Sequence, residues 1–486
     1  MFRNYFKIAF RNLLKHKSRT LINMGGLSIG VVCAVLIFLV IQFEYSFDRY
    51  HADADRIYRL VLKDTQFGEI SFNTGVQYPL PDAMRNDFPQ IEALTIVDAN
   101  YAGEAVLSSS PDELAARRIR EEYLAFVQPD YFELFTYEWL SGDRRSALAR
   151  PNTVVISRSI ARKLFGNINP MGRTVTVQTG SKYDLEVTGV VEDPPPNTDM
   201  PFTVLASYGS VSRSGDPRGT DSWGSTASSV QCYIKLPVGM EPSSIDARMD
   251  AFIENYRDEE RTRWIDYFLQ PLSEIHFDTR FSNFRGRVVP LEMLVALALI
   301  GLFLLVAACI NFVNLNTAVA VTRSKEVGVR KAMGGTRRQL AVHFLGETAL
   351  VTLLTFVVAL GAAEVAVQYL RPLLGYNLEL NLYSNGLLAL VLAALFIATT
   401  LAAGLYPALY LSGFNPIEAI RNKIGTSYGE GLTLRRTLVV LQFAIAQLLI
   451  ISTILIRSNM EYFRTADIVF DKEAVVDVDL PVMDAS

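Results

Sequence analysis

The side chains that most often carry catalysis or bind metals are few in this chain and lie far apart. It has four histidines and three cysteines in 486 residues, and it contains neither H-E-x-x-H nor a Gly-Lys dipeptide. Without Gly-Lys, a phosphate-binding loop of the form G-x-x-x-x-G-K-[ST] cannot exist on it. Scattered histidines and cysteines are poor zinc ligands and poor nucleophile–base pairs, so we expect His51, His276 and Cys232 to be structural or surface residues.

The charged segment with the clearest spacing is RSKEVGVRKAMGG, at residues 323–335. It follows an uncharged run of 30 residues and precedes another largely apolar stretch. Because it is too basic and too short to be a domain, we interpret it as a cytoplasmic elbow between two membrane spans. Glu326 and Arg330 are four residues apart, a spacing that allows an ion pair on one face of a helix.

Apolar residues stand among the charges of this elbow. Val327, Val329 and Met333 offer contacts to a partner, and Gly334 is expected to help stop the helix. A solvated loop that only sets the topology would explain the charges, but it would not explain the apolar residues.

Four uncharged runs reach the roughly 20 residues that a bilayer core demands. They cover residues 20–43, 293–322, 380–417 and 437–456. A further stretch at 343–363 holds Glu347 near its start, where a charge costs less than the roughly 2.5–3.5 kcal/mol assigned at a helix centre. We therefore expect five transmembrane helices, at residues 20–43, 290–322, 341–370, 385–411 and 437–457.

Lysine and arginine cluster in three places beside these spans, and the positive-inside rule places all three in the cytoplasm. The clusters are Arg3, Lys7, Arg11, Lys15, Lys17 and Arg19; Arg323, Lys325, Arg330, Lys331, Arg337 and Arg338; and Arg421, Lys423, Arg435 and Arg436. The cytoplasmic segments are then 1–19, 323–340 and 412–436, and a short loop at 371–384 lies outside. Residues 44–289 are also outside, and an insert of roughly 245 residues can build its own core.

The expected fold class is an α-helical integral membrane protein with a large α/β periplasmic domain between its first two transmembrane helices. Within that domain, residues 153–157 (TVVIS) predict a strand, after which Ser157 caps a helix that ends at Gly166. Residues 173–177 and 183–191 predict a hairpin. We also expect the two membrane helices to continue into the domain as helical stalks.

Gly26 and Gly30 form a GxxxG pair in the first span. Such a pair lets the backbone of another helix approach closely. A chance pair in a span that tolerates glycine is the alternative interpretation.

The composition argues against nucleic acid as a partner. The net charge is −4 and the isoelectric point is near 5.8, whereas phosphate neutralisation needs a concentrated basic face. Cys33 and Cys309 fall inside spans, so Cys232 has no partner for a disulfide within the external domain.

Several segments recur in the same order in a known family. They are FRNYFKIAFRNLLKHKSRTLINMGGLSIG, FEYSFDRYHADADRIYR, PDYFELFTYEWLSGD, ISRSIARKLFG, VTGVVEDPPPN, NFVNLNTAVAVTRSKEVGVRKAMGG and PALYLSGFNPIEAIRNK. Over essentially its whole length the chain resembles the MacB-type, or FtsX-like, permease subunits of ABC transporters, in the two-half variant common in Bacteroidetes-like bacteria.

The resemblance implies an inner-membrane permease without its own cofactor, working with a separate cytoplasmic ATPase that binds ATP and Mg. It also implies a dimeric arrangement of permease halves and a periplasmic adaptor or outer-membrane partner. In this family the elbow is the coupling element that docks on the ATPase. That element maps here to Arg323, Lys325, Glu326, Val327, Gly328, Val329, Arg330, Lys331, Met333 and Gly334.

The sequence does not choose the cargo, which for this family is a peptide, a lipoprotein or an amphipathic drug. One alternative is an FtsX-like signalling subunit that regulates a periplasmic cell-wall hydrolase. Another is a membrane-anchored enzyme or sensor, which a cluster of polar groups in a deep external pocket would favour.

The end of the sequence resembles the beginning of a second half. Asn415-Pro416-Ile417-Glu418 has the order of a capping box and predicts a short amphipathic helix on the inner membrane face. The fifth span then leads into residues 458–486, which resemble the start of a second periplasmic domain. We therefore expect this chain to be either a fragment of a longer two-half protein or the product of a truncated reading frame.

The three basic clusters predict that residues 46–288 face the outside. Single cysteines placed in that segment, in a background without the native cysteines, should react with a membrane-impermeant maleimide before the inner membrane is breached. Cysteines in residues 323–335 should react only afterwards. External positions that need a breached membrane would overturn this topology.

Overall fold

The described chain forms two units, a helical unit and a sheet domain. The computed structural model describes residues 17–66, 68–99, 105–109, 117–179, 181–211, 223, 226–256, 264–376, 378–382, 385–413 and 429–465. The helical unit falls within residues 1–43 and 292–476, and the sheet domain occupies residues 44–291.

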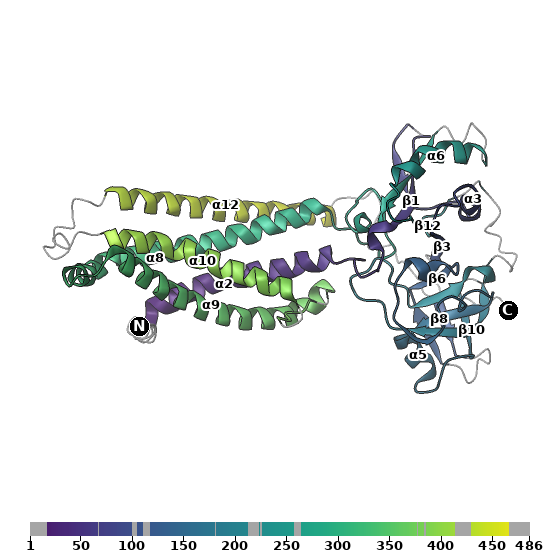
Figure 1. Ribbon diagram of the computed structural model, residues 1–486, viewed down its shortest axis with the longest axis horizontal. Coiled ribbons are helices and arrows are strands. Elements are labelled where there is room, and N and C mark those ends of the chain that lie inside the picture. The colour runs from purple at the N-terminus through teal and green to yellow at the C-terminus, as the bar shows by residue number, and fades with distance from the viewer. Residues whose placement is uncertain are drawn as a thin grey trace. The chain divides into compact units, whose positions relative to one another are not determined.

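Five helices in the described residues are long and apolar enough to cross a membrane. They are α2 (Lys17–Tyr45), α8 (Leu291–Ala332), α9 (Arg337–Leu374), α10 (Gly386–Gly413) and α12 (Gly429–Thr465) (Figure 1). Each overlaps one predicted span, and most continue past it because lysine, arginine and glutamate are good helix formers. The sheet domain lies in the chain between the first two of these helices, which confirms the predicted fold class.

Helices α2, α8, α9 and α10 share one apolar core. Its buried members include Leu27, Val35, Leu305, Phe312, Val351, Phe356, Leu388 and Leu392. Where α10 begins, the side-chain amides of Gln42 and Asn385 exchange two hydrogen bonds of 3.1 and 2.9 Å. An amide pair between apolar helices fixes their register, because a shift would leave both amides unsatisfied.

Gly26 and Gly30 of α2 face α8. A methyl group at Gly30 would come within 2.6 Å of the Ala308 Cβ, and one at Gly26 would come within 3.2 Å of the Asn311 side chain. Gly25 differs, because a methyl group there would meet nothing within 4 Å. The close approach of α2 and α8 therefore depends on the absence of a side chain at Gly30.

Helix α12 is exposed at every side chain from Ile450 to Thr465. Residues 466–486 and the predicted short helix at 415–421 lie outside the described residues. The expectation of a second half stays a prediction.

One mixed sheet organises the domain. Its described strands run in the order β13-β1-β12-β3-β6-β11-β8-β10-β9-β4-β5, with β2 beside β1 and β7 beside β10. The strands are β1 (Ile57–Asp64), β2 (Ser71–Asn73), β3 (Ala93–Ala99), β4 (Ala105–Ser108), β5 (Arg118–Glu121), β6 (Leu124–Val127), β7 (Trp139–Gly142), β8 (Thr153–Ser157), β9 (Thr174–Gln178), β10 (Lys182–Val191), β11 (Val204–Ser207), β12 (Val230–Lys235) and β13 (Ile265–Pro271). The helices are α3 (Leu80–Asp87), α4 (Tyr131–Leu134), α5 (Arg158–Phe165) and α6 (Ser243–Glu254), with short turns η1 (Ala54–Arg56), η2 (Tyr208–Ser210) and η3 (Leu272–Glu274).

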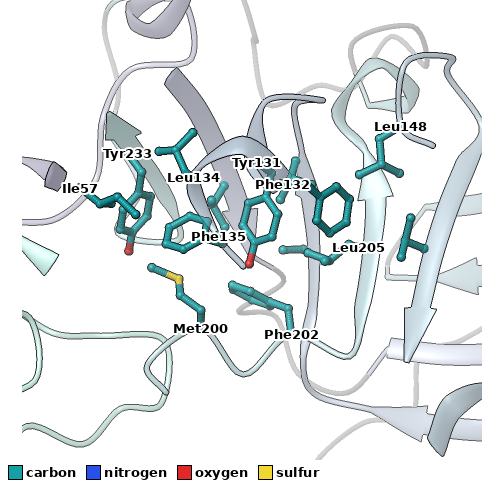
Figure 2. Close-up of a cluster of buried hydrophobic side chains, with 14 of the residues drawn as sticks. Ile57, Tyr131, Phe132, Leu134, Phe135, Leu148, Met200, Phe202, Leu205 and Tyr233 are labelled. Atoms are coloured by element: carbon teal, nitrogen blue, oxygen red, sulfur yellow. The ribbon is translucent and has the colours of Figure 1, made fainter. Parts of the chain in front are cut away.

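The sheet divides into two lobes with separate cores. We call β13, β1, β12 and β3 with α3 and α6 the β1 lobe, and β6, β11, β8, β10, β9, β4 and β5 with α5 the β10 lobe. A third cluster joins them (Figure 2). It packs Ile57 and Tyr233 of the β1 lobe with Leu205 of the β10 lobe, around Tyr131 and Phe135. Met200 and Phe202, from the loop between β10 and β11, also belong to it.

The local predictions within the domain are confirmed. β8 covers 153–157, and the Ser157 hydroxyl accepts a hydrogen bond from Ile160 N at the start of α5. Gly166 follows α5 with a φ of +64°, a conformation that glycine adopts without strain. β9 and β10 pair antiparallel as the predicted hairpin.

The predicted helical stalks are wrong. α2 ends at Tyr45, and turns, η1 and β1 follow it. Asp48 has a φ of +53°, which a continuing α-helix excludes. Phe47, one residue earlier, is buried in the domain. The helix ends here because the contacts that Phe47 and Asp48 make with the domain are more favourable than those of a further helical turn.

Replacing Gly30 by leucine should force α2 and α8 apart. Overpacking of this kind costs about 1–3 kcal/mol, so the full chain in detergent should lose helical circular dichroism at a lower concentration of sodium dodecyl sulfate. Gly25→Leu is the matched control and should be neutral or slightly stabilising, because leucine favours helix. Equal behaviour of the two variants would show that this contact does not hold the helices together.

Candidate functional site

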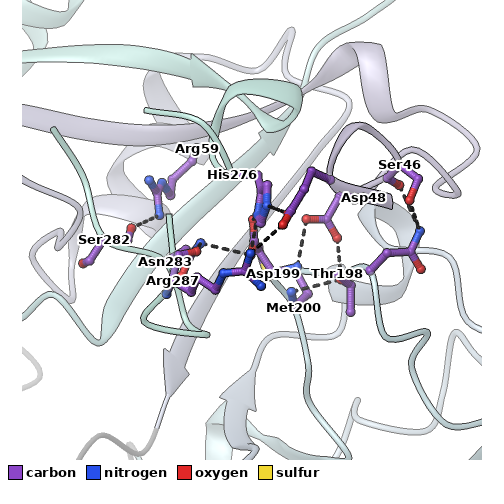
Figure 3. A network of polar contacts seen from close by, with 12 residues as sticks. Ser46, Asp48, Arg59, Thr198, Asp199, Met200, His276, Ser282, Asn283 and Arg287 are labelled. Atoms are coloured by element: carbon purple, nitrogen blue, oxygen red, sulfur yellow. Dashed lines mark hydrogen bonds and ion pairs between the residues drawn. The ribbon is translucent and has the colours of Figure 1, made fainter. Parts of the chain in front are cut away.

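The sheet domain keeps a connected set of polar side chains at the point where the chain leaves α2 (Figure 3). Three segments supply it: the end of α2 with the turn that follows, the loop between β10 and β11, and the segment before α8. We call this set the clasp. Its members are Glu44, Ser46, Asp48, Asn197, Thr198, Asp199, His276, Asn283 and Arg287.

Asp48 forms the first arm of the clasp. Its carboxylate accepts hydrogen bonds from the Thr198 hydroxyl and, at 3.0 Å, from the backbone N–H of Asp199. Beside it, the Asn197 amide donates to the Ser46 hydroxyl at 2.9 Å. A buried carboxylate needs such donors, because an unpaired buried charge is strongly destabilising. The same bonds hold the left-handed backbone at Asp48.

His276 forms the second arm. Its Nε2 lies 2.7 Å from Glu44 Oε2, and its Nδ1 lies 3.1 Å from Asp199 Oδ2. The three residues are at most 3% exposed, and the imidazole stacks on Phe47 with ring centroids 3.6 Å apart. The imidazole therefore bridges the last turn of α2 and the β10–β11 loop.

The segment that leads into α8 closes the clasp. Arg287 lies four residues before α8 and donates to Glu44 Oε1 at 2.5 Å. Asn283 donates to Asp199 Oδ1 at 3.0 Å and to the carbonyl of Arg287 at 2.6 Å. The end of α2, the approach to α8 and the β10–β11 loop are thus held in one hydrogen-bonded network.

The electrostatics of the second arm depend on one proton of His276. Burial by itself lowers the pKa of His276, but hydrogen bonds to Asp199 and Glu44 outweigh it and raise the pKa to about 9. Burial also raises the pKa of Asp199, against the opposing hydrogen bond from His276. A raised histidine pKa contributes stability that is fully present below the ordinary value of about 6.5 and is lost as pH rises through the folded-state value.

The clasp contacts the β10 lobe, whereas the chain connects α2 and α8 directly to strands of the β1 lobe. α2 leads into β1 and β13 leads toward α8, and these two strands are antiparallel neighbours, with Leu60 opposite Leu269. Both strands belong to the β1 lobe. Asn197, Thr198 and Asp199 belong to the loop that joins two strands of the β10 lobe. The chain itself therefore joins α2 and α8 to the β1 lobe, and the clasp adds contacts from the β10–β11 loop to the residues that end α2 and precede α8.

The elbow is the end of a membrane helix. α8 continues through it to Ala332, Gly334 turns the chain with a φ of +95°, and α9 begins after Thr336. The Thr336 hydroxyl accepts from Gln339 N at 3.3 Å, and the Gln339 side chain accepts from Thr336 N at 3.1 Å. This capping box starts α9 immediately after the turn.

The predicted apolar contacts of the elbow divide into two groups. Val327 is fully buried against Leu340 and Phe344 of α9 and Ala408 of α10. The expectation that it offers a contact to a partner is therefore wrong, because its side chain already stabilises this helix junction. Val329 and Met333 are 49% and 75% exposed.

The remaining elbow residues are placed by their backbone. Arg323, Lys325, Glu326, Gly328 and Arg330 lie in the last turns of α8, and their side chains lie outside the described part, so the Glu326–Arg330 pair stays a prediction. Lys331 is half-buried at the end of the same helix. Arg337 and Arg338 are exposed at the start of α9.

Sequence reasoning missed the clasp. It assigned His276 a structural or surface role without identifying a partner, and Glu44 and Asp199 are 155 positions apart in the chain. The only available signal was indirect: an acidic residue at the end of an apolar span, close to an aromatic-rich turn. Nothing in such a pattern names the loop or the histidine that meets it.

A membrane-length helix on each side of an inserted mixed-sheet domain defines the class: an integral membrane protein with a domain between its first two spans. Residues 20–252 match the MacB-like periplasmic core domain, and residues 298–416 match the FtsX-like permease C-terminal domain. The chain belongs to the MacB/FtsX-like family of ABC transporter permeases.

Individual relatives are distant. The chain is 24% identical to the probable syringafactin export ATP-binding/permease protein SyfD of Pseudomonas syringae pv. tomato, over 86% of this chain and 59% of that protein. It is 22% identical to the uncharacterized ABC transporter permease YknZ of Bacillus subtilis, over 85% of this chain and 98% of that protein. A solved domain of a Porphyromonas gingivalis permease covers 50% of this chain and 95% of its own, at 21% identity and a TM-score of 0.39.

Asp48→Ala should destabilise the sheet domain by about 3 kcal/mol. It removes two hydrogen bonds to a buried charge, and alanine is strained in a left-handed backbone. Asn152→Ala is the control, because Asn152 also has a positive φ, of +57°, and should lose only about 1 kcal/mol. All three tryptophans lie in this domain, so denaturation followed by their fluorescence in the full chain measures both variants. Equal losses would mean that the first arm adds no stability.

Proposed function

We propose that this chain is the permease subunit of an ABC exporter-like complex, in which a partner ATPase drives movement of the sheet domain outside the inner membrane. The observation that carries the proposal is the continuity of α8. It runs for 42 residues without a break, about 63 Å at 1.5 Å per residue. A bilayer core accounts for roughly 30 Å of this length, so one rigid rod links the elbow with the approach to the clasp.

The inner end of that rod suits a docking role. Val327 anchors α8 to α9 and α10, so a force on the elbow moves the three helix ends together rather than bending one of them. The exposed Val329 and Met333 are followed in the chain, across the Gly334 turn, by the exposed Arg337 and Arg338. An apolar centre with a charged rim is the usual composition of a protein interface. The positive-inside rule places this surface in the cytoplasm, where an ATPase that binds ATP and Mg would meet it.

The outer ends transmit the movement. α8 approaches the domain through Arg287, and α2 enters it at Glu44, and these two residues are hydrogen-bonded to each other. A shift of α8 relative to α2 would strain the hydrogen bond between Glu44 and Arg287 and the rest of the clasp. The β10 lobe would then move relative to the β1 lobe. Such movement would act on a peptide, lipoprotein or amphipathic compound already outside the membrane, in a dimeric assembly with an adaptor or outer-membrane partner.

Val329→Asp combined with Met333→Asp should abolish transport without unfolding the chain. Both side chains are exposed, so folding should be unaffected, whereas two charges at the centre of an interface should cost at least about 2 kcal/mol of binding, roughly thirtyfold in affinity. The measurement is co-purification with the partner ATPase, which is recognised by its phosphate-binding loop, together with ATP hydrolysis in proteoliposomes. Val238→Asp, at an 85% exposed valine of the sheet domain, is the control for adding a surface charge. Normal complex formation by the double variant would remove the elbow from the coupling path.

A further inference from the structure

The geometry of the second arm fixes how many protons its three side chains must hold. Both ring nitrogens of His276 face carboxylate oxygens, Glu44 at 2.7 Å and Asp199 at 3.1 Å. An ionised carboxylate only accepts hydrogen bonds, so each contact requires its own proton. The three groups therefore hold two protons between them, either both on the imidazole or one on the imidazole and one on a carboxyl. With a single proton, one nitrogen lone pair would face an oxygen lone pair.

The surroundings favour keeping both protons. Glu44 comes from α2, Asp48 from the turn after it and Asp199 from the β10–β11 loop, and all three acids are at most 2% exposed. Arg287 contacts Glu44, and Arg285 acts on Asp199 through its charge. With two protons on the triad, its net charge is −1, which Arg287 balances. Loss of one proton would make the net charge of this buried triad −2, close to the buried Asp48, which is strongly destabilising.

His51, the nearby second histidine of the domain, has a different role. Its Nδ1 accepts a hydrogen bond from the backbone N–H of Thr136 at 3.0 Å, and its Nε2 lies 3.6 Å from Asp48 Oδ1. An Nδ1 that accepts carries no proton, so this bond requires the neutral imidazole. His51 can therefore keep its contacts without a second proton, whereas His276 cannot.

We propose that the Glu44–His276–Asp199 contact is a two-proton latch, which releases the β10–β11 loop from the end of α2 when it loses one proton. Opening separates Asp199 from His276 and weakens the neighbouring Asp48 arm, because Asp48 binds the backbone N–H of the same Asp199. The β10 lobe then keeps its contacts through the sheet, the apolar cluster around Tyr131 and Phe135, and polar contacts such as that of Arg85 with Gln128. The consequence for transport, that the pH outside the membrane adjusts coupling between helices and lobe, rests on the proposed function. The latch itself does not.

The pH window follows from the raised pKa of His276. In the open state the imidazole is hydrated and has an ordinary pKa near 6.5, whereas in the closed clasp the pKa is about 9. Linkage then makes opening about tenfold easier for each pH unit between about 6.5 and 9, and independent of this proton above that range. The window includes mildly alkaline conditions outside the cell membrane.

Hydrogen–deuterium exchange of the full chain in nanodiscs tests the latch without any ATPase. The readout is the protection of the backbone amides of Asp199 and Met200, as a ratio to exchange of the unfolded peptide at the same pH. Wild type should lose protection by about tenfold per pH unit between pH 6.5 and 9. Amides of β12, in the centre of the sheet, report at each pH that the fold is intact.

Asp199→Asn is the decisive variant. Its amide oxygen can still accept from Asn283, and its N–H₂ can donate to Nδ1 of a neutral His276, so both contacts survive with one proton fewer. Protection should then be independent of pH. In His276→Gln both N–H donors lie on one nitrogen and cannot span the carboxylates that face the two ring nitrogens, so this variant should lose protection at every pH. Asp266→Asn removes an exposed ion pair with Lys63 and should keep the wild-type slope.

Two results would overturn the latch. One is constant protection in wild type across this range. The other is an unchanged pH slope in Asp199→Asn, which would assign the titration to another group. Neither result bears on docking at the elbow, so failure of the latch and failure of the proposed function remain separable.

Discussion

Glu44 is a buried carboxylate in the last turn of α2, and its burial requires that nearby groups compensate its charge. The other contacts of the clasp follow from this requirement. The partners come from two directions: Arg287 from the approach to α8 and His276 from the segment after β13. Because His276 then needs a second acceptor, it draws in Asp199 from the β10–β11 loop. One buried carboxylate is thereby connected to the segment before α8 and to the β10–β11 loop.

Such an arrangement balances rigidity against movement. Buried ion pairs add little net stability compared with apolar packing, yet removing one partner is costly. Buried ion pairs therefore fix the relative positions of their residues but add little to the free energy of unfolding. The apolar cluster around Tyr131 and Phe135 supplies the stability that joins the lobes, while the polar contacts decide which elements move together. Stability and geometry are thereby assigned to different sets of residues.

Much of the architecture could be predicted from sequence because its signals are local. The uncharged runs locate the membrane helices, and the Ser157 cap and Gly166 stop delimit α5 within a single window of ten residues. The clasp could not be predicted, because Glu44, Asp199 and His276 carry no mutual spacing and meet only through the sheet. The stalks failed for a related reason: residues 46–56 have helical composition, but Phe47 and Asp48 find better partners far away in the chain. Val327 and Val329 were equivalent in sequence, and only the packing of α9 and α10 distinguishes them.

The pairing of β1 with β13 has a consequence for how this family diversifies. The first and last long strands of the inserted domain are hydrogen-bonded neighbours, so the domain begins and ends within the width of two adjacent strands, about 5 Å. Everything between them can lengthen, shrink or be exchanged for a foreign domain while the distance between the attachment points stays the same. Recombination at these two strands would join the same membrane helices to a different inserted domain. Among the clasp residues, Asn197, Thr198 and Asp199 of the β10–β11 loop would have to be supplied again.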